Sequence, residues 1–253
     1  MSQNSVVVFE PHNDDFIIGM GATGIQLLNS GWDIVSVVMT DGRYGGIIDD
    51  PEQTANIRVS EKNQESNQLG TEWINLDYED QSLAATFSDP IKRNELLSDI
   101  RQIVRDLDPS IAFVSAPIEG HSDHRATHDI ITSAFEQISC ETTLIEYTVW
   151  NLPFFSPKSI DTNQIYLVEA DPTFNKKVST IQIHESQLEE YPYDEMAVNF
   201  NRYLENLYHP ACEAEYVELF HIPNDQPPAT GFIESVEAID VTSRFHTDDT
   251  SFS

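Results

Sequence analysis

The chain alternates short β-branched runs with longer amphipathic stretches, and this alternation limits the folds that it can adopt. We expect strands over residues 6–9, 34–39, 73–76, 111–115 and 143–149, separated by helices over 17–28, 52–69, 91–107 and 124–138. Gly31, Gly70 and the pair Asp108-Pro109 act as helix stop signals. Such a β-α-β-α order is typical of a parallel sheet covered on both faces. The sequence therefore predicts an α/β fold, a three-layer Rossmann-like arrangement with a mostly parallel sheet.

The pattern changes after Trp150. A connection containing Pro and Phe precedes strand-like runs over 165–168 and 216–222, with helices expected over 175–188 and 196–207. We expect these elements to pack onto the same sheet as a C-terminal α+β elaboration. We therefore assign residues 1–222 to one domain and 223–253 to an acidic, partly ordered C-terminal extension. In that extension, 231–233 and 238–241 are candidate edge strands, and about the last dozen residues are expected to fray.

The composition is strongly acidic. The 253 residues include 43 Asp and Glu against 13 Lys and Arg, which gives a formal net charge of −30. Such a charge repels nucleic acid and anionic membranes, so we expect neither as a partner. The chain is also 40% hydrophobic and 10% aromatic, which argues for a packed core and against a disordered acidic protein. The acidic residues are therefore expected on the surface.

The acidic residues are spread along the whole chain, and lysine is scarce. Because concentrated salt screens repulsion between surface charges, we hypothesise a cytoplasmic protein of a salt-accumulating organism. The sequence shows no apolar leader and no run long enough to span a bilayer, which favours the same location. Unfolding in millimolar and in molar potassium chloride tests this: we expect markedly higher stability in molar salt, and equal stability would contradict the hypothesis. Cys140 and Cys212 are expected to be isolated thiols.

A glycine pattern in the first predicted helix resembles a dinucleotide-binding motif. Residues 19–24 read G-x-G-x-x-G, and Asp41 ends the next strand. A dinucleotide site needs its first glycine in the turn directly after the strand, so that the helix N-terminus meets the pyrophosphate. Here His12 to Asp15 occupy that turn, and the glycines fall inside the helix. We therefore favour a packing role, in which small residues let the helix lie close to the sheet.

Two clusters of His and Asp follow predicted strands. His12, Asp14 and Asp15 come after the first strand, and His121, Asp123 and His124 come after the fourth. Active sites of open parallel sheets lie at these carboxyl ends. Each cluster alone is compatible with helix capping. Together, two imidazoles and a carboxylate with open positions favour a divalent metal site, either zinc or the iron of a non-heme oxygenase.

The spacing suggests a role for each residue. His12 and Asp15 are three apart, so one helical turn brings them toward a common point, and His124 completes the metal-ligand set. Asp14, beside the metal at a helix N-terminus, is the candidate general base for a water molecule. His121 is placed to hydrogen-bond a developing oxyanion or to donate a proton to a leaving amine, and Asp123 is expected to orient it.

These motifs resemble those of the PIG-L/LmbE family of zinc-dependent N-deacetylases. That family carries His-Pro-Asp-Asp-Glu and His-Pro-Asp-His, and the corresponding segments here are residues 12–16 and 121–124. The glycines of the first helix, Thr40-Asp41-Gly42 and the residues 58–61 leading to Leu69-Gly70 also look similar, as do Lys177, residues 184–187 and 218–220. The resemblance covers most of residues 5–221.

The resemblance implies Zn²⁺ held by His12, Asp15 and His124, with Asp14 as general base and His121 as electrostatic stabiliser or acid. It also implies that Arg58 and Asp80 contact a sugar-like substrate. Asn13 and Ser122 replace prolines of the two motifs, and Phe16 replaces a glutamate. The first two changes remove rigidity from the loops, whereas the third removes a polar group from the edge of the site.

The function that we expect is hydrolysis of an N-acetyl or other N-acyl group on an amino sugar or glycoconjugate. The partner is then a small N-acetylated sugar, and the sequence is compatible with a homo-oligomer. One alternative is a metal-binding or carbohydrate-binding protein of the same fold with impaired catalysis, which the changes at Asn13, Phe16 and Ser122 would support. The other alternative, a non-heme iron oxygenase, fits the ligand types less well, because such ligands usually lie on a β-barrel whereas this chain is α/β.

Overall fold

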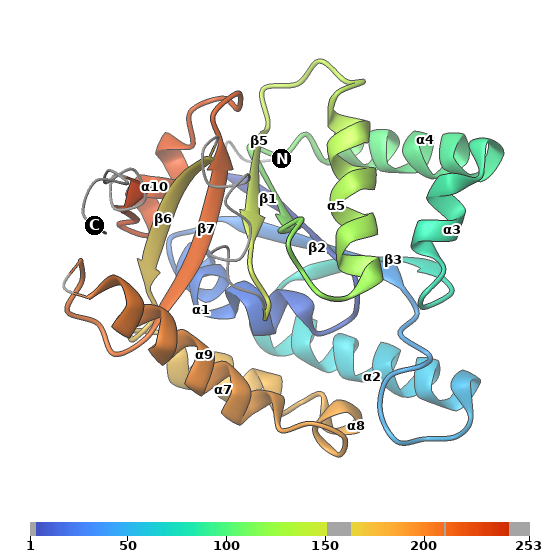
Figure 1. Cartoon of the computed structure of the whole chain (residues 1–253), viewed down its shortest axis with the longest axis horizontal. Helices are drawn as coiled ribbons and strands as arrows, with labels where there is room; N and C mark the ends of the chain where they lie inside the picture. Colours follow the sequence, from blue (N-terminus) through green and yellow to red (C-terminus); the bar gives the residue numbers. More distant parts are fainter. Residues whose placement is uncertain (1–3, 151–162, 210, 243–253) are drawn as a thin grey trace, which may run out of the picture.

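The computed structural model describes residues 4–150, 163–209 and 211–242 (Figure 1). Within them, eight strands form one sheet in the order β3-β2-β1-β4-β5-β7-β6-β8. The strands are β1 (Ser5–Glu10), β2 (Asp33–Thr40), β3 (Glu72–Tyr78), β4 (Ile111–Ser115), β5 (Thr143–Tyr147), β6 (Asn163–Glu169), β7 (Val217–Pro223) and β8 (Ile239–Asp240).

The first five strands are parallel, and the C-terminal three add to the sheet in antiparallel pairs. Strand β1 lies at the centre of the parallel part, where Val6 pairs with Ile34 of β2 and with Ile111 of β4. Strand β7 runs antiparallel to β5 and β6, and β8 pairs antiparallel with β6. The predicted α/β architecture with a C-terminal elaboration is confirmed.

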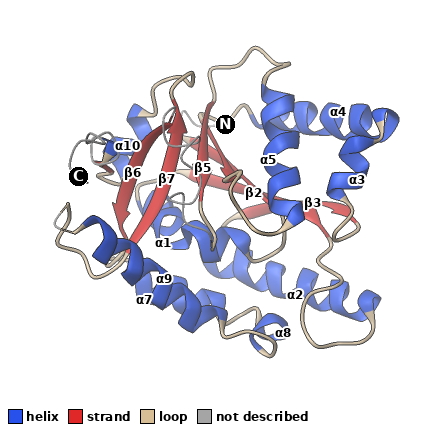
Figure 2. Cartoon of the chain, in the orientation of Figure 1, coloured by secondary structure: helices blue, strands red, loops and turns tan. Residues whose placement is uncertain are grey.

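Helices cover both faces of the sheet (Figure 2). Along β1, Val6 and Val8 face a core shared with α1, α7 and α10, whereas Val7 and Phe9 face a second core shared with α3, α4 and α5. This alternation follows from the two-residue period of a strand. The helices are α1 (Asp15–Asn29), α2 (Pro51–Leu69), α3 (Leu83–Ser88), α4 (Pro90–Leu107), α5 (Ser122–Phe135), α7 (Phe174–Ile181), α8 (Glu185–Leu188), α9 (Tyr193–Tyr208) and α10 (Thr230–Ser235).

The glycines of α1 lie where a side chain would collide with its surroundings. A Cβ atom on Gly19 would lie 2.7 Å from the ring of Tyr147 on β5, and one on Gly24 would lie 2.6 Å from the ring of Phe16. The predicted packing role of these glycines is confirmed.

Helix α1 is kinked at Met20, where φ is −141° and ψ is 23°. The kink frees backbone N–H groups of the second half of the helix, and the carboxylate of Glu218 accepts from those of Ala22 at 3.0 Å and Thr23 at 2.7 Å. Lys177 donates to the same carboxylate at 2.7 Å, and both side chains are fully buried. A buried ion pair from the C-terminal elaboration therefore caps the second half of α1.

Helix α2 lies where the sequence predicts it, but its buried face is charged. It begins at a strong cap, since the side chain of Asp50 accepts from the N–H groups of Glu52 and Gln53 and Pro51 starts the helix. Its buried residues are polar apart from the last, namely Thr54, Arg58, Glu61, Lys62, Glu65, Ser66 and Leu69. This helix is therefore held by hydrogen bonds and ion pairs, several of which reach the site described below.

Two predicted elements differ from the structure. Residues 231–233 belong to helix α10 and not to a strand, because the helical turn directs Phe232 and Val236 together into the core, where the ring of Phe232 contacts those of Phe113 and Phe220. The helix predicted over 175–188 is two helices, α7 and α8, interrupted at Gln182 to His184. The edge strand expected within 238–241 is confirmed as β8.

Other expectations have mixed outcomes. The connection after Trp150 and the frayed C-terminal end lie outside the described residues, and the boundary at 222/223 stays a prediction. Cys140 is exposed and Cys212 is buried, and both are free, as expected. In the part of the chain that the structure describes, no helix has the length and apolar character needed to cross a bilayer.

His128, one turn after His124 on α5, makes a pH-sensitive contact. Its ring lies 3.1 Å from Glu146 of β5 and 3.4 Å from its neighbour Asp129. Burial alone would lower the pKa of His128, but the hydrogen bonds and charges of Glu146 and Asp129 together outweigh burial and raise that pKa. His221 of β7 lies opposite Glu146 in the pairing of β5 with β7, and burial lowers the pKa of His221.

A histidine whose pKa is higher in the folded than in the unfolded state stabilises the fold when it is protonated. This stabilisation is complete at pH values below the unfolded pKa of about 6.5 and is lost as the pH rises through the folded pKa. We therefore expect wild type to exceed His128→Gln in unfolding free energy by about 1.5–3 kcal/mol at low pH, the range of a hydrogen bond to a charged group, and by less above neutrality. Urea titrations in molar potassium chloride between about pH 6 and 8 measure this difference. A difference that grows with pH would contradict the assignment.

Candidate metal centre

The two His and Asp clusters meet at the carboxyl edge of the parallel sheet. Asp14 stands at the N-cap position of α1, in the loop that follows β1, without a side-chain capping bond, and Asp15 is the first residue of that helix. His121 caps α5, and Asp123 and His124 lie in its first turn. Both clusters reach one cavity of about 260 Å³, which the predicted residues His12, Asp14, Asp15, Arg58, Asp80, His121 and His124 line. Asp123 is fully buried just behind it.

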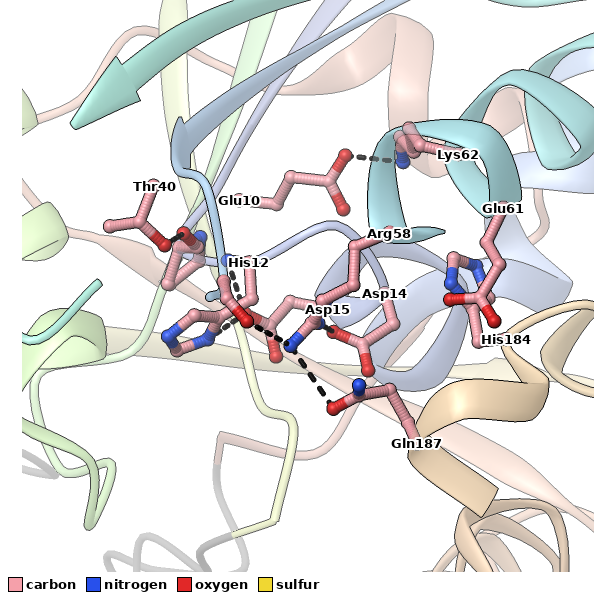
Figure 3. Close-up of polar contacts among 12 residues, drawn as sticks. Glu10, His12, Asp14, Asp15, Thr40, Arg58, Glu61, Lys62, His184 and Gln187 are labelled. Atoms are coloured by element: carbon pink, nitrogen blue, oxygen red, sulfur yellow. Dashed lines mark hydrogen bonds and ion pairs between the residues drawn. The ribbon is translucent and has the colours of Figure 1, made fainter. Parts of the chain in front are cut away.

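Asp15 lies at the centre of the cluster. Its Oδ2 atom accepts from the backbone N–H of His12 at 2.8 Å, and it lies 3.1 Å from Nδ1 of His12 and 3.2 Å from Nε2 of His124. Burial would raise the pKa of Asp15, but His124 and His12 hold it well below its usual range. One imidazole nitrogen of each histidine therefore lies against the same ionised oxygen of Asp15, and Figure 3 shows the contact with His12.

The second nitrogen of His12 faces two further carboxylates. Nε2 lies 3.3 Å from Asp80 and 3.8 Å from Asp123. Burial would lower the pKa of His12, but the carboxylates of Asp123, Asp15 and Asp80 raise it well above its usual value. Backbone N–H groups hold these two acids in place, since Tyr44 donates to Asp80 at 3.1 Å and Gln81 to Asp123 at 2.6 Å. The carboxylate of Asp123, expected to orient His121, thus faces His12.

Two sets of ligand atoms lie close enough to hold a metal ion together among the described residues. One consists of His12, His121 and His124, and the other of His12, Asp80 and Asp123. The predicted set of His12, Asp15 and His124 is neither of these, although Asp15 contacts both histidines. All three sets use His12, whose two ring nitrogens point to opposite sides of the ring. A histidine that binds a metal through one nitrogen usually donates its other N–H to a carboxylate. Asp80 and Asp123 are suited to that outer role when Nδ1 of His12 faces the metal beside Asp15.

Arg58 forms an ion pair with Asp14, the candidate general base. Its Nη2 atom donates to Oδ1 of Asp14 at 2.7 Å, and its Nη1 atom donates to Oε1 of Gln187 at 3.0 Å. Only 3% of Arg58 is exposed, although it lines the cavity. Arg58 therefore fixes one oxygen of Asp14, which leaves the other oxygen for chemistry in the cavity.

His121 has a defined tautomer. Its Nδ1 atom lies 3.2 Å from the backbone nitrogen of Asp123, which can only donate, so Nδ1 accepts and the neutral ring carries its proton on Nε2. Burial lowers the pKa of His121, and the neighbouring His12 and His124 lower it further. His121 is therefore suited to act as a neutral hydrogen-bond donor toward the cavity.

Sequence reasoning did not assign several residues that line the cavity. Gln187 lies in the quoted 184–187 segment, but its contact with Arg58 joins residues 129 apart in the chain. Glu119 accepts from the N–H of Val149 at 2.7 Å, and its Oε2 atom lies 3.9 Å from Nδ1 of His124. Trp150 and Tyr193 also line the cavity and stack on each other, with ring centroids 5.4 Å apart. No motif connects these residues to the metal clusters, so only the fold reveals them.

Comparison with known proteins gives consistent matches. The model of the PIG-L family, described as GlcNAc-PI de-N-acetylase, matches residues 7–135, just over half of the 253-residue chain. Diacetylchitobiose deacetylase of Thermococcus kodakarensis is 28% identical over 200 residues, covering 73% of this chain and 70% of that protein.

Two solved structures with different activities are similar to this chain in fold. The N,N'-diacetylchitobiose deacetylase from Pyrococcus horikoshii is 24% identical with a TM-score of 0.66, covering 90% of this chain and 88% of that one. GalB, a 4-carboxy-2-hydroxymuconate hydratase from Pseudomonas putida, is 14% identical with a TM-score of 0.67, covering 89% and 98%. These likenesses show the fold alone, since the same scaffold carries different reactions. Because the family model spans both His and Asp clusters and the sheet that brings them together, the chain belongs to the PIG-L family.

Proposed function

We propose that this protein is a zinc-dependent hydrolase that removes an N-acetyl group from an amino sugar or glycoconjugate. The observation that carries the proposal is the convergence of His12 and His124 nitrogens on one oxygen of Asp15, at 3.1 and 3.2 Å, beside Asp14 in the same cavity. The similarity to deacetylases supports this reaction class.

The donor set fits zinc. Two imidazole nitrogens and one carboxylate oxygen are ligands that catalytic zinc sites use. Tetrahedral ligands with bonds of about 2.0–2.1 Å lie roughly 3.3 Å from one another, close to the separations seen around Asp15. When bound, zinc supplies Lewis-acid polarisation of the amide carbonyl and lowers the pKa of a water molecule to about 7. His12, Asp15 and His124 would hold the ion.

Asp14 acts as the general base. Arg58 orients its carboxylate through the 2.7 Å hydrogen bond to Oδ1, and Oδ2 remains to take a proton from the attacking water. After the carbon–nitrogen bond breaks, the protonated Asp14 returns that proton to the departing amine. The proton thus moves from water to amine through one side chain.

His121 stabilises the oxyanion that forms on the amide carbonyl. Its N–H on Nε2 is the group that the neutral tautomer offers to the cavity. This assigns His121 a hydrogen-bonding role and leaves proton delivery to Asp14. Asp123 and Asp80 then orient His12 through its Nε2 atom, on the side of the ring away from the metal. Asp80 and Arg58 also line the cavity in which the sugar would bind.

The proposal is tested by measuring acetate release from N-acetylglucosamine, diacetylchitobiose and other N-acetylated sugars. The assay is made in molar potassium chloride, because the acidic composition predicts instability in dilute salt. We expect release from at least one sugar by the zinc-loaded protein and loss of release after chelation. Zinc binding without acetate release from any N-acyl compound would contradict the proposed reaction.

A further inference from the structure

A chain of buried charged side chains lies behind the metal cluster. Glu10 of β1 pairs with Lys62 of α2 (Figure 3). Lys62 also donates to Glu65 at 2.7 Å, and Glu65 lies 2.8 Å from Nε2 of His184. Glu10, Lys62 and Glu65 are fully buried, and His184 is 1% exposed. None of these residues lines the cavity, so the mechanism above does not use them.

Glu10 connects the two ends of the loop that carries the proposed metal ligands. Its Oε2 atom accepts from the backbone N–H of Phe16 at 2.9 Å, and its Oε1 atom accepts from the hydroxyl of Ser36 on β2. The loop between Glu10 and Phe16 contains His12, Asp14 and Asp15. The carboxylate of Glu10 therefore lies against the backbone at the start of α1.

Helix α2 holds this loop at two points. Lys62 follows Arg58 by one helical turn, so both lie on the same face of the helix. Arg58 donates to Asp14, and Lys62 pairs with Glu10 at the beginning of the loop. Lys62 is thus the second basic side chain through which α2 fixes the loop.

The same helix also fixes the segment that contacts Arg58. Glu61 accepts from both the N–H and the hydroxyl of Ser186 at 2.8 Å. Gln187, the next residue, accepts from Arg58. The charged face of α2 therefore joins the metal loop to α8, and Lys62 lies at its centre between Glu10 and Glu65.

We propose that Glu10 and Lys62 are positioning residues whose buried ion pair sets the geometry of the 12–15 loop and thereby the affinity of the metal centre. The proposal rests on the metal site of the proposed function but adds two residues that touch neither metal nor substrate. A buried ion pair is weak evidence for a stabilising role, because well-packed apolar side chains often stabilise a fold as well or better. The pair instead gives the loop one fixed position, since Glu10 must meet Lys62, Ser36 and Phe16 at once.

The experiment compares zinc affinity, measured by chelator competition, with the melting temperature of the same protein. The variants are Glu10→Gln, Lys62→Met and the double variant Glu10→Leu/Lys62→Met. The control is Glu218→Gln, which breaks the fully buried pair of Glu218 with Lys177, since Glu218 contacts the second half of α1 at Ala22 and Thr23. All proteins are measured in molar potassium chloride.

We expect Glu10→Gln and Lys62→Met to bind zinc about tenfold more weakly, as loss of an outer partner of a metal site does. Glu218→Gln should lower the melting temperature while zinc affinity stays at the wild-type value. The double variant should regain part of the melting temperature lost in the single variants, because neither Glu10 nor Lys62 is left without the other and Glu65 keeps His184 as a partner. It should still bind zinc weakly.

The proposal is overturned if zinc affinity follows melting temperature across all four variants, or if the double variant regains both. Acetate release is recorded in parallel. A wild-type chain that binds zinc without releasing acetate would contradict the proposed reaction, while the affinities of the variants would still decide the role of Glu10 and Lys62.

Discussion

Replacing Asp14 with Asn is expected to reduce acetate release by about 10²–10⁴-fold, the range that a positioned acid–base group contributes. The amide cannot take a proton from water or return one to the amine. It can still accept the hydrogen bond that Arg58 donates to Oδ1, so the loop should keep its geometry. Zinc content should therefore remain at the wild-type level.

The measurement is kcat for acetate release together with zinc per chain by elemental analysis. Asp106→Asn, on the exposed surface of α4, makes the same chemical change away from the cavity and should leave both values unaltered. Asp14→Asn with near-normal kcat would show that another group moves the proton. Loss of zinc from this variant would instead place Asp14 among the ligands.

Replacing Asp15 with Ala is expected to weaken zinc binding by more than about 100-fold, the upper end of what loss of an outer partner costs, and to abolish acetate release. The Asp15 oxygen lies against both ring nitrogens of the centre and also accepts the backbone N–H of His12. Its removal takes away one ligand and the group that aligns the other two.

Asp80→Asn is the matched comparison for Asp15→Ala. Asp80 contacts the outer nitrogen of His12, so its loss should cost zinc affinity only about 10–100-fold. Zinc affinity is measured by chelator competition for both variants. If Asp80→Asn were the more damaging change, the metal would belong with His12, Asp80 and Asp123.

The sequence predicted those parts of the site that local patterns determine. His12 and His124 follow apolar runs that alternate with helical patterns, which favours parallel strands, so their meeting at one sheet edge was expected from this order. The glycines of α1 were assigned to packing because they fall inside the helix, and the contact of Gly19 with Tyr147 confirms this.

The parts that were missed depend on contacts between distant segments. The charged face of α2 is buried because its partners come from β1 and from around α8, up to 129 residues away, as in the contact of Arg58 with Gln187. From its own sequence, a helix with so many charged and polar residues is predicted to be exposed to solvent. The segment 231–233 was read as a strand because a short apolar run does not distinguish strand from helix, and the aromatic pocket for Phe232 forms only in the fold.

The position of the metal ion tests the central claim most directly. We would grow crystals of the zinc-loaded protein and record anomalous scattering at the zinc absorption edge. The account predicts one strong peak within bonding distance of Nδ1 of His12, a carboxylate oxygen of Asp15 and Nε2 of His124. A peak beside Nε2 of His12 and the carboxylates of Asp80 and Asp123, or no peak in this cavity, would contradict it.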